Sequence, residues 1–270
     1  MSDPNDLPTP PWWSSRETRH AARDEARRQR RQEKEARRGE EAAPAREPVT
    51  PERIADAALR LIDVQGIDGL TVRALAQELG VGTMTLYWYV QNKDEVLDLV
   101  ADRMLAGIPL PPAEMSWQTS VRQVAIAVRA ALLRHGGAVP VMLGRGSFGP
   151  NGLRIVDNAI RVFRAAGFKE ADAADAYFAV ANFVNGFAAQ QTAGSFLASR
   201  PGFDGKGYFR MVQAYIEALP VDRYPNLQAA APRVFSASLD ERFAFGLDCL
   251  IGGLEAKLSA SRAAEDSDAS

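Results

Sequence analysis

Apolar side chains recur at helical spacing along most of this 270-residue chain, and that periodicity limits what it can fold into. From Thr50 onward, no stretch shows the alternation of apolar and polar residues that is typical of a half-buried strand. Clusters of glycine and proline interrupt the helical pattern near residues 107–112, 136–152, 201–207 and 220–232. The sequence therefore predicts an all-α fold.

Residues 1–48 differ in composition from the rest of the chain. Between Arg16 and Glu41, the residues are mostly Arg, Glu, Gln and Ala, with almost no large apolar side chain. Such a segment cannot bury enough surface to fold alone, so we expect a disordered charged tail. The alternative is a basic arm that makes nonspecific contacts with DNA phosphates. After it, we predict two folded domains and a second disordered tail, with the bounds 49–107, 113–260 and 261–270.

Composition narrows the classes of protein. A single cysteine, Cys249, excludes an intramolecular disulfide, which fits a cytoplasmic protein. The only histidines are His20 and His135, too few for a His/Cys zinc site. No apolar run is long enough to span a bilayer, and the N-terminus lacks the apolar region of a secretion signal. We therefore expect a cytoplasmic protein with no membrane association, no metal and no cofactor.

The first ordered residues carry the signals of two successive helices. Thr50 followed by Pro51 is typical of a helix start, and Gly66 lies where that helix should end. Thr71 is placed to cap a second, short helix that ends at Gly80. This arrangement predicts two helices joined by a short connection.

A turn and two more helices follow. Gly80-Val81-Gly82 is a tight turn, after which Thr83 is placed to cap a third helix over 84–90. Asn92, with Glu95 three residues later, marks the start of a fourth helix. A helix, a short helix, a glycine-containing turn and another short helix form the helix-turn-helix arrangement.

The third helix has an unusual surface. Leu86 and Val90 suffice to anchor it, and its other side chains are mostly aromatic, hydroxyl or thioether groups. Hydroxyls and methyls of this kind can contact base edges and phosphates in a major groove. Because the formal net charge is −2, DNA binding would depend on a few local groups and not on a basic field. The pattern by itself is equally compatible with a helical core that does not bind DNA.

Two stretches make the assignment specific. Residues 66–82 (GIDGLTVRALAQELGVG) and 85–93 (TLYWYVQNK) resemble the N-terminal signature of the TetR family of transcriptional regulators, and most of all its tetracycline repressor subgroup. The resemblance implies that the helix over 83–89 lies in the major groove. The DNA contacts that it implies, taken with the residue types, are Thr71, Arg73, Thr83, Met84, Thr85, Tyr87, Tyr89 and Lys93.

The C-terminal half predicts about six helices, two of them apolar on nearly every face. These two, over 172–196 and 239–258, need covering on both sides, which favours a dimer over a single chain with two core helices. Residues 243–258 (FAFGLDCLIGGLEAKL) are also similar to the last helix of the tetracycline repressor subgroup. The resemblance implies a four-helix dimer interface in a C-terminal ligand-binding and dimerisation domain. A twofold dimer would bind a palindromic operator in double-stranded DNA.

The resemblance also implies a ligand site in the C-terminal domain. In tetracycline-binding members of the family, a histidine and a threonine help to hold magnesium–tetracycline, and Met142 and Arg145 fall at those positions. A thioether is a poor ligand for a hard cation, so we expect neither magnesium nor tetracycline. The lining instead suits a largely apolar small molecule, with ordinary core packing as the alternative reading. The predicted ligand-binding residues are Val124, Val128, Met142, Arg145, Phe163, Phe178, Asn182 and Phe183.

These features predict a ligand-responsive repressor that binds its operator as a homodimer. The helix over 92–106 is the natural lever between the domains, and 107–109 is a hinge candidate. An activator and a helix-turn-helix that contacts proteins are the alternatives. An enzyme is not expected, because the chain lacks a catalytic triad, a metal cluster and a phosphate loop.

Overall fold

The computed structural model describes residues 48–146, 148–198, 202 and 204–268, and over these residues it contains helices and turns but no strand. The all-α prediction is confirmed. The predicted N-terminal tail lies outside the described residues except for Pro48. In chain order the helices are α2 (Pro51–Gly69), α3 (Val72–Glu78), α4 (Thr83–Leu86), α5 (Lys93–Met104), α6 (Trp117–Arg134), the 3₁₀ helix η1 (Gly136–Ala138), α7 (Val139–Arg145), α8 (Pro150–Ala165), α9 (Glu170–Ala198), α10 (Gly205–Glu217), α11 (Pro225–Ser236) and α12 (Leu239–Asp268).

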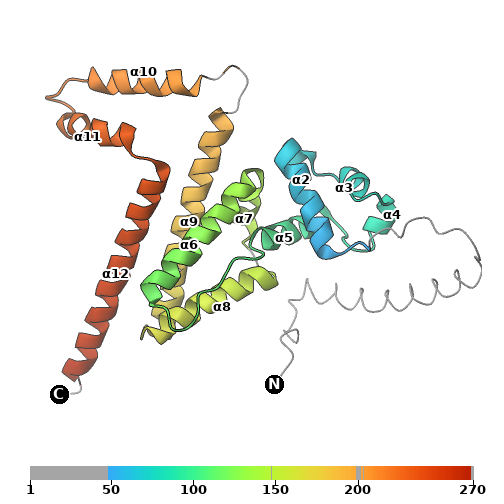
Figure 1. Ribbon diagram of the computed structural model, residues 1–270, viewed down its shortest axis with the longest axis horizontal. Coiled ribbons are helices and arrows are strands. Elements are labelled where there is room, and N and C mark those ends of the chain that lie inside the picture. Colours follow the sequence, from blue (N-terminus) through green and yellow to red (C-terminus); the bar gives the residue numbers. More distant parts are fainter. Residues whose placement is uncertain (1–47, 147, 199–201, 203, 269–270) are drawn as a thin grey trace, which may run out of the picture.

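The molecule is elongated, with helices α2, α3 and α4 at one end and α12 at the other (Figure 1). Helices α6, α7, α8 and α9 lie between them, and α5 leads from the N-terminal group into this central part (Figure 1). Helices α10 and α11 form a hairpin beside the ends of the long helices α9 and α12 (Figure 1). The helix-turn-helix is therefore joined to the rest of the molecule mainly through α2 and α5.

Three predicted helix caps of the N-terminal group are confirmed. The Thr50 hydroxyl accepts from the Arg53 backbone N–H at 3.2 Å, and Thr71 does the same for Ala74 at 3.1 Å. At the start of α5, the Asn92 Oδ1 accepts from the Glu95 backbone N–H at 2.8 Å. Each side chain satisfies a backbone donor that the helix leaves unpaired, and so fixes where the helix begins.

Two details of the helix-turn-helix differ from prediction. The residue before α4 is Gly82, which has no side chain to form a cap, and Thr83 is the first helical residue. Helix α4 also ends at Leu86, and residues 87–89 continue as turns. The Leu86 carbonyl accepts from both Tyr89 and Val90, so the chain tightens there instead of completing the predicted seven-residue helix. In α2, Gly66 has a φ of 73° and breaks the regular helix at the predicted position, and a short helical stretch then continues to Gly69.

The N-terminal core is formed by the inner faces of α2 and α5, with α3 and α4 packed against them. Ile54, Leu86 and Val100 are each fully buried in it. Arg103 on α5 also donates two hydrogen bonds to the Asp56 carboxylate on α2, at 2.6 and 2.9 Å. This bidentate pair holds the two helices in a fixed orientation. The same core continues into α6, η1 and α7, so the two domains share a packed boundary.

A second core joins α6, α8, α9 and α12. At one end, the rings of Trp117, Phe163 and Phe168 pack with centroids 5.4 to 5.9 Å apart. Further along α6, the guanidinium of the buried Arg129 lies 4.6 Å from the centre of the Phe243 ring. Arg129 also donates hydrogen bonds to Gln191 on α9 and forms an ion pair with Asp240 on α12. These contacts fix the spacing of three helices around the interior of the domain.

The last helix is longer than the sequence predicted. The apolar register indicated a helix over 239–258 and a disordered tail over 261–270, whereas α12 continues to Asp268. Its extension contains no glycine or proline, so a helix that is already nucleated can propagate through it. None of the described helices is long and apolar enough to cross a membrane by itself. The bent pair formed by α6 and 136–145 meets only the length and composition criteria.

Candidate functional site

The surface of the helix-turn-helix exposes large side chains that a protein normally buries. Met84 is 72% exposed, Trp88 is 53% exposed and Tyr87 is 48% exposed. All three belong to α4 or to the turn that follows it. Exposed apolar and aromatic side chains gathered on one element indicate a contact surface. Trp88 was not among the predicted DNA contacts, although it is slightly more exposed than Tyr87.

The predicted DNA-contact residues form two groups by exposure. Thr71, Arg73, Thr83, Met84 and Tyr87 are exposed, whereas Thr85, Tyr89 and Lys93 are partly buried. Tyr89 packs against the N-terminal core. The Lys93 ammonium donates to the Ile67 carbonyl at 2.7 Å, which ties the start of α5 to the end of α2. Lys93 keeps two further N–H donors, so this bond positions the ammonium and does not exclude a phosphate contact.

Electrostatics single out Arg73 on this surface. Residues 49–107 contain nine acidic and five basic side chains, so the domain is acidic overall. Arg60 pairs with Glu78, and Arg103 pairs with Asp56. Arg73 is exposed and forms no ion pair or hydrogen bond with any residue that the structure describes. Its guanidinium is therefore free to bind an acceptor outside the protein.

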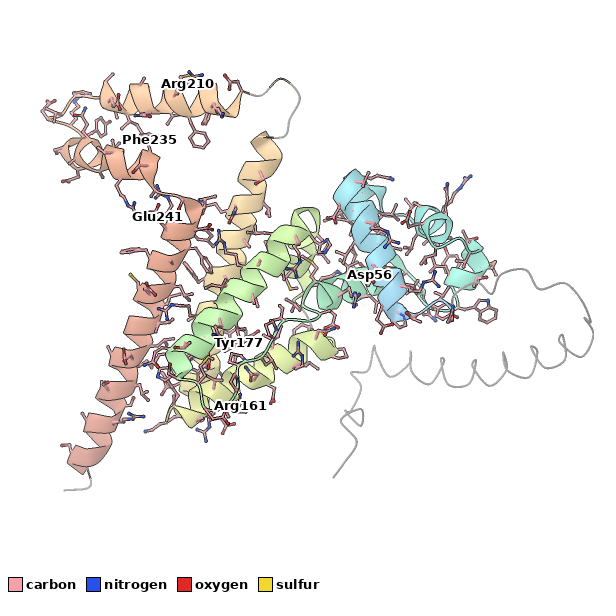
Figure 2. The ribbon with its side chains drawn as sticks, viewed as in Figure 1. Asp56, Arg161, Tyr177, Arg210, Phe235 and Glu241 are labelled. Carbon is pink, nitrogen blue, oxygen red and sulfur yellow. The ribbon has the colours of Figure 1, made fainter. Side chains whose placement is uncertain are left out.

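The C-terminal domain encloses a cavity of about 140 Å³ between α6, α8 and α9. Helices α5 and α7 also contribute to its wall through Leu105 and Met142. Most of the lining is aliphatic or aromatic, and none of the described residues that line it carries a charge. Figure 2 shows the side chain of Tyr177 in this central part of the domain. A cavity with apolar walls and a few polar groups is the usual form of a small-molecule site.

Four polar side chains interrupt the apolar lining: Ser120, Asn158, Tyr177 and Asn185. The Asn158 Oδ1 accepts a hydrogen bond from Arg161, so its oxygen is already engaged. Burial raises the pKa of the Tyr177 hydroxyl above its usual value, which keeps the phenol neutral at physiological pH. The polar part of the lining therefore offers uncharged hydrogen-bonding groups.

The structure brings half of the predicted ligand-binding residues together. Val124 and Val128 on α6, Met142 on α7 and Phe163 on α8 all line the cavity. Their helical spacing and apolar character placed them on inward faces, which is what periodicity can predict. These four predicted residues therefore lie together on the wall of one cavity.

The other four predicted residues lie outside the lining of this cavity. Phe178 is 59% exposed and Asn182 is also exposed, because both lie on the outer face of α9. Phe183 faces α12, where its ring stacks on Phe243 at 5.3 Å. Arg145 on α7 forms ion pairs with Asp94 and Asp98 on α5, at 2.8 Å in the case of Asp98. Each side chain is thus occupied or directed elsewhere.

Sequence reasoning missed all four polar residues of the lining. Ser120 and Asn158 are buried polar residues on otherwise apolar faces, a pattern that could have drawn attention to them. In each case, the signal is a polar side chain at an inward position of an amphipathic helix.

Helix α5 connects the cavity to the helix-turn-helix. The Asp102 carboxylate on α5 is 6% exposed and accepts from the Gly152 backbone N–H at 3.0 Å and from Asn151 at 2.8 Å. Both donors lie in the first turn of α8, which lines the cavity. A side chain on Gly149 would overlap the Asp102 carboxylate, so the two helices approach closely. Together with the Arg145 ion pairs, these bonds attach α5 to two helices of the cavity wall.

One side of α9 and α12 carries small or exposed apolar residues and has no covering element in the described chain. Along α12, Phe245 is 72% exposed, and Cys249, Gly252 and Gly253 are exposed as well. Added Cβ atoms at Gly186 on α9, and at Gly252 and Gly253, would meet nothing within 4 Å. We call these residues, with Phe178, the open face.

Family models match both halves of the chain. The model described as "Bacterial regulatory proteins, tetR family" matches residues 54–100, and that described as "Tetracyclin repressor-like, C-terminal domain" matches residues 108–258. The tetracycline repressor protein class D of Escherichia coli is 36% identical over 214 residues, which cover 77% of this chain and 90% of that protein. The transcriptional repressor DrrR1 of Streptomyces coeruleorubidus is 30% identical over 225 residues, 81% of this chain and 83% of that repressor.

A solved structure shares the fold. The Streptomyces coelicolor protein ActR, crystallised in complex with actinorhodin, superimposes with a TM-score of 0.69 and 32% sequence identity, covering 78% of this chain and 99% of that one. Fold, helix-turn-helix and interior cavity define the class of helical, ligand-responsive transcriptional regulators. The chain belongs to the TetR family. Its relatives are transcriptional regulators and not enzymes.

Proposed function

We propose that this protein is a repressor that binds a palindromic operator as a homodimer and releases it when a largely apolar small molecule enters the α6–α8–α9 cavity. The observation that carries the proposal is the attachment of α5, which ends the helix-turn-helix domain, to two helices of the cavity wall. We place the activity in the cytoplasm, where a bacterial regulator meets DNA.

DNA recognition rests on the exposed residues of α3, α4 and the following turn. Met84 and Tyr87 present apolar and hydroxyl groups suited to base edges, and Thr83 adds a hydroxyl. Arg73 supplies a cation with no protein partner among the described residues, and Lys93 an ammonium oriented by Ile67. Because the domain is acidic, these two cations contribute a larger share of the phosphate attraction than they would on a basic surface.

Release of the operator follows from a shift between two arrangements of the dimer. A ligand that fits one arrangement of α6, α8 and α9 better than the other changes the position of α5 through Asp102 and Arg145. Operator affinity then falls by the difference in the ligand's affinity for the two arrangements, and by no more. The related protein ActR, crystallised in complex with actinorhodin, supports a small-molecule effector.

Selection from a random DNA library at fixed, near-physiological salt tests the operator. We expect an inverted repeat to be enriched, and the variant R73A to bind it with a salt dependence shallower by about one counterion per half-site. R134M changes an exposed arginine on α6 and serves as the control with unchanged binding. Enrichment of no motif would overturn the repressor proposal and favour a protein-contact role. Tighter operator binding in the presence of an effector would instead identify an activator.

A further inference from the structure

Ser120 carries a hydroxyl that the protein itself leaves unsatisfied. The residue is 2% exposed, and its Oγ has no hydrogen-bond partner in the part of the chain that the structure describes. Buried side-chain polar atoms are nearly always paired, because an unpaired one loses its bonds to water without compensation. A serine on an apolar helix face thus needs an explanation that packing does not give.

The residues around the Ser120 hydroxyl suggest an explanation. Ser120 lines the cavity together with Val121 and Val124 on α6 and with Val162 and Phe163 on α8. The Asn158 oxygen that shares the cavity already accepts from Arg161. The Ser120 O–H is therefore a donor on a largely apolar wall without an acceptor among the described residues.

We propose that Ser120 is a specificity-determining residue that donates a hydrogen bond to an uncharged oxygen, of the ketone type, on an otherwise apolar ligand. This rests on the proposed function, because it takes the cavity as the effector site. A charged ligand does not fit, because none of the described lining residues offers a counter-charge and burying an unpaired ion is costly. The volume of about 140 Å³ matches a ligand the size of a single substituted ring, since an apolar cavity of about 150 Å³ admits benzene.

Equilibrium dialysis of three monosubstituted benzenes tests the donor. We expect acetophenone to bind the full chain, and S120A to weaken its binding by up to about tenfold, the usual effect of one hydrogen bond. Isopropylbenzene has a similar shape without the carbonyl, so S120A should leave its affinity unchanged within about twofold. Benzoate should bind either protein far more weakly, because its carboxylate would be buried without a counter-charge.

Thermal unfolding without ligand separates a binding role from a structural one. Removing an unsatisfied buried hydroxyl relieves its desolvation cost, so S120A should raise Tm by about 2–4 °C. The matched control is S116A on the same helix, because the Ser116 hydroxyl accepts from the Thr119 backbone N–H at 3.3 Å. S116A should lower Tm and leave the ratio of ketone to isopropyl affinity unchanged.

Three outcomes would overturn the proposal: equal binding of the ketone by S120A and the unchanged protein, no detectable binding of acetophenone or isopropylbenzene, or a Tm that falls in S120A. None of these outcomes affects the test of operator binding, because the DNA selection is carried out without an effector. Failure of this inference is thereby distinguishable from failure of the repressor proposal.

Discussion

At the scale of single residues, the ion-pair partners of Arg145 show that it does not bind the ligand. Its position beside the cavity suggested a ligand anchor, yet its guanidinium reaches α5 and pairs with Asp94 and Asp98. If the guanidinium turned toward a ligand of low polarity, it would lose both ion pairs and gain no charged partner. We therefore assign Arg145 to the connection between the domains.

The variant R145M tests that assignment. Binding of acetophenone should stay within about twofold, because the side chain does not line the cavity. Stability should fall by only about 0.5–1 kcal/mol, since the ion pairs are partly exposed to solvent. Release of the operator by the same compound should weaken. R134M again serves as the control, because Arg134 on α6 is exposed. A large loss of ligand affinity in R145M would restore the anchor role.

Residue types predicted backbone caps well and cavity chemistry poorly. Thr50, Thr71 and Asn92 act on donors within three residues of themselves, so local sequence contains the whole interaction. The partners of Arg145 lie 47 and 51 positions away, and the isolation of the Ser120 hydroxyl depends on what three helices leave beside it. Such features exist only once the chain is packed.

At the scale of elements, the turn between α3 and α4 uses its two glycines differently. Gly80 has a φ of 66°, in the left-handed region that side chains disfavour. Gly82 has an ordinary φ of −71°, and an added Cβ would come only within 3.9 Å of the Thr85 hydroxyl. One glycine is therefore required by the backbone, and the other is replaceable.

Chemical denaturation of two variants measures this difference. G80A should lose about 1–2 kcal/mol, the cost of a left-handed conformation for an L-residue. G82S should be neutral or slightly stabilising, because a serine at this position can cap α4. Equal destabilisation by both substitutions would contradict the assignment of the turn.

Helix existence was predictable, and helix ends were less so. Caps and apolar periodicity correctly located α2, α5, α9 and α12. Periodicity overestimated α4, because Tyr87 and Trp88, between the buried Leu86 and Val90, are exposed to solvent. It underestimated α12, whose last turns have no apolar register to read. Apolar periodicity marks the buried face of a helix. It therefore cannot locate the end of a helix in a segment that is not buried.

At the scale of the whole molecule, the open face bears on assembly. A surface of glycine, cysteine and phenylalanine along two long helices costs solvation in a monomer and admits close approach of another helix. The twofold arrangement typical of homodimers would place the open faces of two copies together and set two recognition helices for successive major grooves. The open face and the palindromic operator are then two consequences of one symmetry.

The variant G253E tests this connection. The unchanged protein should have twice the 29.4 kDa mass of the chain in solution, and G253E should shift it to the mass of one chain, because two carboxylates would be buried near the twofold axis. Operator affinity should fall about 100-fold or more, since each half-site would then be bound without its partner. G144E is the matched control: Gly144 is also an exposed helical glycine with nothing within 4 Å of an added Cβ, but it lies on α7, away from the open face. It should keep the dimer mass. A monomeric unchanged protein, or a G253E dimer with full operator affinity, would show that the open face serves a different partner.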